Sequence, residues 1–280
     1  MKKILLLIAA VGLLMGTISC GDDDDVRPVR TETTVTYPMF NHMTSGNNII
    51  GITLTQNKLV FDTAKHTGTL ELNYNDGTER TVSLKDISAK PKRLGFYELT
   101  ASPTAQITGF KGYADFNELA FRYDYTTAEG IRVISMTPEV FFLSTSTSVT
   151  YDDNTKPSKS DITNYQFDIS PATMTATITV KQLVHEKDLK NFNYIKAENV
   201  PIVLTANGFS INGTNIKTTA EYISFDYTKG SNAKTTTDYP VKTFNANIDL
   251  VNDKLDADFM LGGSATVTAT GTAYSNYSIK

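Results

Sequence analysis

The amino-acid sequence predicts an all-β protein of two antiparallel β domains, each a sandwich or a half-barrel. Tyr and Phe together make up 10% of the residues, and such aromatic side chains, with the many threonines, suit the half-buried surface of a sheet. Short apolar–polar alternations recur between Gly, Asn, Asp and Pro residues, which is typical of strands joined by turns. No window of helical length keeps a three- and four-residue apolar period.

Hairpins are predicted where two alternating runs flank a turn signal. The clearest hairpin joins residues 69–74 to residues 81–84 through Asn75-Asp76-Gly77, because an Asp-Gly pair between alternating runs is a strong hairpin signal. The other predicted hairpins join 120–125 to 131–134, 203–205 to 209–211, and 256–261 to 265–269, and residues 175–180 form a further strand.

The domain boundary is placed at residues 152–159, a polar, charged and proline-broken segment between two apolar-rich regions. The β domains are therefore expected at 35–151 and 160–280. About 260 residues follow the N-terminal leader, which is more than one typical domain contains.

The two halves show similar landmarks, which suggests a diverged internal duplication. Phe61-Asp62 and Phe167-Asp168 are each followed, eight residues after the Phe, by the Thr of a predicted strand. Residues 107–116 also resemble residues 241–250. The separation between the copies grows from 106 to 134 residues, so an extra loop is expected within 218–238. The alternative is that alternating strands look alike in any β protein.

The N-terminus reads as an export signal. Lys2 and Lys3 precede an apolar or small run over residues 4–16, and Cys20 is the only cysteine. That run is shorter than the roughly 20 residues that a membrane-spanning helix needs. Residues 1–19 are therefore predicted to be a cleaved signal peptide.

Ile18-Ser19-Cys20 resembles the lipobox of bacterial lipoproteins, although Thr17 stands where an aliphatic residue is usual. Gly21 and the four aspartates that follow it resemble the export signal of surface-exposed lipoproteins in the Bacteroidetes. The resemblance implies lipidation of Cys20, an acidic tether over residues 20–34, and a lipid-anchored protein on the outside of the outer membrane. A periplasm-facing lipoprotein and a secreted protein with a chance cysteine are the alternatives.

The charge of the chain argues against a nucleic-acid-binding protein, and its cysteine content argues against a disulfide-stabilised fold. Removal of the leader leaves 24 of the 26 basic residues against 30 acidic ones, a net charge of −6, and nucleic-acid binding needs a concentrated basic surface. With its one cysteine in the anchor, the exported fold has no disulfide to rely on. The aspartate run is read as a solvated spacer, since nothing fixes its geometry for calcium.

No catalytic, cofactor or metal site is predicted. The three histidines have no shared ligand spacing, and neither H-E-x-x-H nor G-x-S-x-G occurs. Carboxylates that could act in pairs exist, but the sequence gives no reason to pair any of them. The histidines are His42, His66 and His185, and the carboxylates are Glu98, Asp115, Glu118, Glu139 and Asp168.

Aromatic and turn residues give further expectations. Tyr123 and Tyr125 share one strand face with Phe121, so a core position is favoured over a sugar-stacking surface. Asp62 and Asp168 are expected to cap turns. Asp62-Thr63-Ala64 resembles the O-glycosylation acceptor motif of exported Bacteroidetes proteins.

The second half, over residues 160–275, resembles β-rich lipoproteins of gut Bacteroidetes with domains of unknown function. The likeness lies in residues 164–178, Asn207-Gly208-Phe209 and Tyr239-Pro240-Val241. It implies lipocalin-like or half-barrel sheets and transfers no catalytic residues. The function expected is non-catalytic binding of a glycan or a protein. The alternatives are an accessory subunit of a surface complex and a lipocalin-like carrier of a small apolar ligand.

Replacing the anchoring cysteine tests the location. In the Cys20→Ala variant we expect the protein to lose labelled palmitate and to leave the membrane fraction, because two or more acyl chains are needed for a stable anchor. Val26→Ala, outside the lipobox and the aspartate run, serves as a control. Undiminished membrane association of Cys20→Ala would contradict the lipoprotein interpretation.

Overall fold

The computed structural model describes residues 32–93, 95–160 and 162–273. The predicted signal peptide, Cys20 and the tether as far as residue 31 lie outside the described residues. Residues 32–34, which were expected to end the tether, belong to the first strand, where Glu32 pairs with Asp62. The all-β prediction is confirmed, since every regular element described is a strand. No helix able to cross a membrane occurs in the described part.

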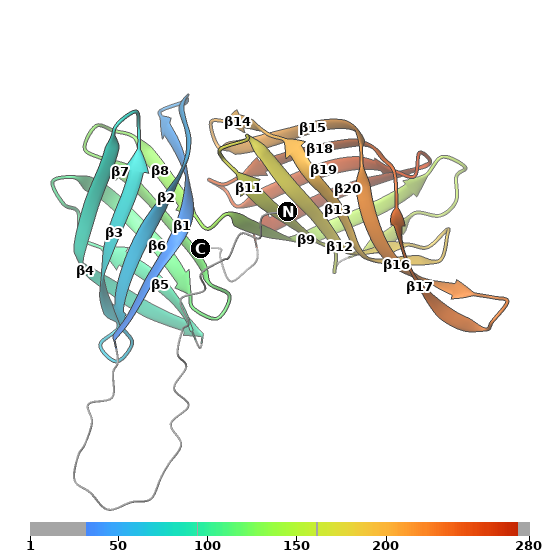
Figure 1. The fold of residues 1–280 in the computed structure, drawn as a ribbon, viewed down its shortest axis with the longest axis horizontal. Helices are drawn as coiled ribbons and strands as arrows, with labels where there is room; N and C mark the ends of the chain where they lie inside the picture. The colour runs from blue at the N-terminus through green and yellow to red at the C-terminus, as the bar shows by residue number, and fades with distance from the viewer. Residues whose placement is uncertain (1–31, 94, 161, 274–280) are drawn as a thin grey trace, which may run out of the picture. The chain divides into compact units, whose positions relative to one another are not determined.

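The first eight strands form a closed antiparallel barrel in chain order, in which β1 pairs with both β2 and β8 (Figure 1). The strands are β1 (Glu32–Ser45), β2 (Asn48–Asp62), β3 (Thr67–Asn75), β4 (Glu79–Arg93), β5 (Phe96–Ala101), β6 (Ile107–Asp115), β7 (Ala120–Thr127) and β8 (Arg132–Met136).

Aromatic side chains fill much of the barrel interior. Tyr123 and Tyr125 are buried with Phe121, each at most 1% exposed, so their predicted core position is confirmed. The Phe121 ring stacks on Tyr37 at a centroid distance of 3.8 Å, and the hydroxyls of Tyr37 and Tyr123 form a hydrogen bond. The interior of the barrel is thus a packed core.

The remaining strands form one antiparallel sheet with the order β14-β15-β18-β19-β20-β9-β11-β12-β13-β16-β17, to which β10 is added through β9 (Figure 1). The sheet curls so that β13 contacts β15, and its inner face is a large apolar core. The strands are β9 (Glu139–Tyr151), β10 (Ser158–Ser160), β11 (Asn164–Ser170), β12 (Thr175–His185), β13 (Lys190–Pro201), β14 (Val203–Thr205), β15 (Gly208–Ile216), β16 (Thr218–Asp226), β17 (Ser231–Asp238), β18 (Val241–Asp249), β19 (Lys254–Leu261) and β20 (Ala265–Ala273).

The predicted hairpins are present as β3–β4, β7–β8, β14–β15 and β19–β20. One turn type recurs in three other hairpins. An Asp side chain accepts hydrogen bonds from the backbone N–H groups two and three residues later, at 2.8 to 3.2 Å. The residue four places after each Asp has a positive φ of 52° to 55°. These turns begin at Asp62, Asp115 and Asp249, so the capping role predicted for Asp62 is confirmed.

The passage between the sheets differs from the expected boundary. Residues 139–151, expected in the first domain, form β9, which pairs with β20, β11 and β10 in the second sheet. The chain leaves the barrel after Met136 and enters the second sheet at Glu139. Of the polar segment 152–159, residues 152–157 are instead the loop between β9 and β10, and residues 158 and 159 belong to β10. The charged residues and the proline of the loop indicate a turn at the surface. Such a turn occurs both in domain linkers and in hairpin loops.

The two pairs of landmarks that suggested a duplication differ in how they compare in the structure. Asp115 pairs with Ala120 and Asp249 pairs with Lys254 at the same position of the same turn, so 107–116 and 241–250 end in one turn type, which Asp62 also begins. The first landmark is not equivalent. Asp62 begins its turn, whereas Asp168 lies inside β11 and its carboxylate accepts from the Gln166 amide at 3.0 Å. Duplication of the whole chain remains a hypothesis.

The described residues belong to one compact unit, in which outward side chains of the barrel pack into the second core. Phe40, Ile134 and Met136 on β1 and β8 belong to the apolar cluster of the second sheet. The buried Arg122 of β7 pairs with Asp253 in the β18–β19 turn and donates to the carbonyl of Leu250.

His42 joins the same two parts. It is 2% exposed, and its Nε2 donates to the carbonyl oxygen of Thr205 in β14 at 2.8 Å. Burial lowers the pKa of His42, against the opposing effect of that hydrogen bond, and the positive charge of Arg132 lowers it further. The folded state therefore favours the neutral imidazole.

This pKa shift predicts a loss of stability in acid. The unfolded chain protonates His42 near pH 6.5, whereas the folded chain does so only at lower pH, so stability falls as the pH drops below about 6.5. His42→Gln should reduce the fall in urea midpoint between about pH 7.5 and 5.5. His66→Gln, in a half-exposed turn, should keep the wild-type fall. An identical pH dependence in wild type and His42→Gln would refute the assignment.

The Arg122–Asp253 pair predicts a second stability effect. Arg122→Leu should lower the free energy of unfolding by about 3 kcal/mol, because removal of one partner leaves a largely buried carboxylate uncompensated. Asp253→Asn keeps the left-handed backbone conformation, which Asn tolerates, and tests the charge alone. A double-mutant cycle with urea unfolding should give coupling above about 1 kcal/mol. Purely additive effects would mean that the pair contributes nothing.

Candidate functional site

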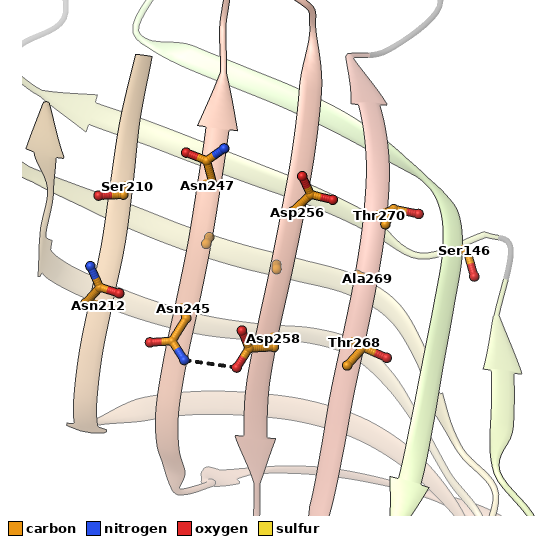
Figure 2. Close-up of a pocket in the computed structure, with 12 residues that line it drawn as sticks. Ser146, Ser210, Asn212, Asn245, Asn247, Asp256, Asp258, Thr268, Ala269 and Thr270 are labelled. Atoms are coloured by element: carbon orange, nitrogen blue, oxygen red, sulfur yellow. Dashed lines mark hydrogen bonds between the residues drawn. The ribbon is translucent and has the colours of Figure 1, made fainter. Parts of the chain in front are cut away.

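The outer face of the second sheet carries two parallel rows of polar side chains (Figure 2). Alternation along β15, β18, β19, β20 and β9 sends apolar residues into the core and polar residues outward, and the strand register aligns the outward ones. The first row is Asn212, Asn245, Asp258, Thr268 and Ser148, and the second row is Ser210, Asn247, Asp256, Thr270 and Ser146. We call these two rows the polar face.

Side chains of the polar face line an open hollow of about 430 Å³. Its floor is formed by small residues, since Ala246, Ala257 and Ala269 alternate with the polar side chains and point into the core. No basic side chain occurs among the described residues that line the hollow, which include two carboxylates. The hollow is therefore shallow, polar and acidic.

Most of the hydrogen-bonding capacity of the polar face is unused by the protein. Asn245 Nδ2 donates to Asp258 Oδ2 at 2.9 Å (Figure 2). Within the described part of the chain, the side chains of Asp256, Asn247 and Asn212 have no hydrogen-bond partner. Neighbouring side chains on such a face lie about 5 Å apart across strands and about 7 Å apart along a strand. The face therefore presents a grid of donors and acceptors to solvent.

A second hollow, of about 510 Å³, lies on the outer face of β12, β13 and β16. Its lysines are already engaged, because Lys181 Nζ donates to Gln166 Oε1 at 2.9 Å and Lys196 Nζ lies 2.7 Å from Glu198 Oε1. It offers fewer free groups than the polar face.

The three histidines lie apart and in structural positions. His42 is buried between the two sheets, as described above. His66 occupies the positive-φ position of the β2–β3 turn, with its ring 5.9 Å from the ring of Tyr97. His185 is 3% exposed, and its Nδ1 accepts from the backbone N–H of Asp188 at 3.3 Å. Burial lowers the pKa of His185.

Two of the candidate carboxylates come together, which the sequence did not indicate. Glu139 of β9 and Asp168 of β11 are directly opposite in the strand register. Burial raises the pKa of Glu139, and the negative charge of Asp168 raises it further. Both lie on an outer face beside β12, and no group of three potential His, Cys, Asp or Glu metal ligands occurs among the described residues.

The remaining candidates have structural roles or are exposed. Glu98 Oε2 pairs with Lys92 Nζ at 2.6 Å, and Asp115 caps the β6–β7 turn. Glu118 lies exposed in that turn. Thr63 is exposed in the β2–β3 turn, a position that suits the predicted O-glycosylation, which stays a prediction.

Sequence reasoning missed the polar face, although a signal for part of it was present. Residues 256–261 were predicted as a strand, and Asp256 and Asp258 are two apart, which places both carboxylates on one face. Asn245 and Asn247 show the same spacing on β18. The register that aligns the two pairs is a long-range property, and the residue pattern of one strand does not contain it.

Comparison with protein-family models gives no match, and no curated protein matches the sequence. Among solved structures, the chain matches the crystal structure of the isotype 1 transferrin binding protein B from serogroup B Neisseria meningitidis, with 8% sequence identity and a TM-score of 0.25. The match covers 87% of this chain and 78% of that chain. A likeness this low carries no argument, so the interpretation of the polar face depends on its own residues.

Proposed function

We propose that this protein is a non-catalytic binding protein, anchored through Cys20 on the outer-membrane surface, whose polar face binds a neutral glycan. The observation that carries the proposal is the pair of aligned rows on the outer face of β15, β18, β19, β20 and β9. Sugars present neighbouring hydroxyls that both donate and accept, and carboxylate and amide side chains complement them.

The charge of the polar face limits the class of glycan. Asp256 and Asp258 accept hydrogen bonds strongly from hydroxyl donors and repel carboxylate or sulfate groups. The residues that line the hollow include no aromatic ring, so stacking adds little to affinity. We therefore expect weak binding to a single site, strengthened where several anchored copies meet a multivalent glycan.

The same face supports binding rather than hydrolysis in this proposal. Hydrolysis of a glycosidic bond by two carboxylates needs one with a raised pKa beside the scissile bond. Two described carboxyls have a pKa raised by burial, Glu139 of the β9–β11 pair and Asp253 of the β18–β19 turn, and neither lines the hollow. The proposal accordingly assigns no catalytic step to Asp256 or Asp258.

A glycan array probed with residues 21–280, produced without the lipidated cysteine, tests the proposal. We expect retention of neutral glycans, and about a tenfold or greater loss of affinity in both Asp256→Ala and Asp258→Ala, because each removes charged hydrogen bonds worth about 1.5–3 kcal/mol. Asp86→Ala, an exposed carboxylate of the barrel strand β4, should bind as wild type. Binding of anionic glycans only, or equal binding by all three variants, would refute it.

One alternative, an accessory subunit of a surface complex, is favoured by the free edge of β17 at the end of the second sheet. The other alternative, a carrier of a small apolar ligand, finds less support, because Tyr37, Phe121, Tyr123 and Tyr125 occupy the interior of the closed barrel. The glycan proposal therefore stands first.

A further inference from the structure

The two edge strands of the second sheet differ in whether other parts of the chain cover them. β14, at one end, is three residues long, it contacts β2, and the carbonyl of Thr205 accepts the hydrogen bond from His42. β17, at the other end, is eight residues long and pairs with β16 alone among the described strands. One edge is covered and the other is open.

The open edge has few of the features that protect edge strands from pairing. β17 contains no proline, and its register with β16 is regular over all eight residues, without a bulge. Its one lysine, Lys234, is engaged by Glu221 at 3.0 Å. Thr235, Thr236 and Thr237 are β-branched residues that favour strand pairing.

The hairpin of β16 and β17 reaches beyond the neighbouring strands of its sheet (Figure 1). Near its tip, Phe225 and Tyr227 are 43% and 74% exposed, with ring centroids 4.9 Å apart. Exposed aromatic residues beside an open strand edge are typical of a surface that meets another protein.

We propose that β17 pairs with β17 of a second copy of this chain, antiparallel, about a two-fold axis that passes through Thr235. A two-fold axis perpendicular to the sheet keeps each face of the sheet on its own side, and side chains directly opposite in an antiparallel pair lie on the same face. The sequence numbers of two opposed residues must therefore differ by an even number. In each allowed register, one residue lies on the axis, opposite the same residue of the other copy.

Pairing length and charge together select among these registers. Only the registers centred on Lys234 and Thr235 pair seven of the eight residues of β17, whereas centring on Thr236 would oppose Lys234 to Asp238 but would pair only five. Centring on Lys234 would place it against the Lys234 of the other copy, and like charges directly opposite are destabilising. Centring on Thr235 opposes Thr235 to itself, Lys234 to Thr236, and Asn232 to Asp238. Seven of the eight residues of β17 (Ser231–Asp238) are then paired, and no like charges are opposed. The edge is complementary to itself, which favours a second copy over an unrelated strand.

Single-cysteine variants of residues 21–280, which lack Cys20, test the pairing by disulfide formation. Thr235→Cys should form a covalent dimer on its own, because the two residues meet on the axis within disulfide reach. Asn232→Cys and Asp238→Cys should each form no covalent dimer alone and should form a disulfide-linked dimer when mixed. Dimer fractions are measured on non-reducing gels after mild oxidation.

Sedimentation equilibrium supplies an independent measurement without cysteines. The wild-type chain should show an average mass that rises with concentration, and Thr235→Lys, which places two like charges on the axis, should abolish the rise while the circular dichroism spectrum stays unchanged. No cross-linking of Thr235→Cys, or equal cross-linking at all three positions, would overturn the proposal. A concentration-dependent mass that Thr235→Lys leaves intact would also overturn it.

Discussion

The hydrogen bonds between β1 and β8 are the constraint on which the first half depends. A chain whose described elements are all strands must pair or cover every strand edge, because unpaired backbone groups are costly when buried and invite association when exposed. The register of Phe40 with Met136 and of Thr44 with Arg132 closes the barrel and removes both of its edges. Closure also turns Phe40 and Met136 outward, where they become part of the core of the second sheet.

The second sheet meets the same constraint only in part, and its proposed function depends on the face that alternation leaves exposed to solvent. Its inner residues form the large apolar core, so every second residue of five strands must face solvent. At Asn245, Asn247, Asp256 and Asp258 those residues carry amides and carboxylates. The polar face thus results from the register of a curled sheet, and no single loop builds it.

Fold class and local pairing could be predicted from the residues, because both depend on short-range pattern. Asn75-Asp76-Gly77 predicted its hairpin through turn chemistry, and the aromatic residues 121, 123 and 125 predicted a buried face through alternation. The passage between sheets could not be predicted, because the polar segment 152–159 looks the same as a hairpin loop and as a linker. The pairing of Glu139 with Asp168 required the β9–β11 register, which no local pattern contains.

The hairpin at 218–238 explains why the second half is not a closed barrel. This segment was expected as a loop, and it instead forms β16 and β17. The path from β15 to β13 contains eight strands, the number in the closed barrel, and β13 already contacts β15. The edge of β13 that would close the barrel pairs with β16 over Lys190–Ala197. It is therefore not free to pair with β15 there. The inserted hairpin thus holds the sheet open and moves its free edge outward to β17.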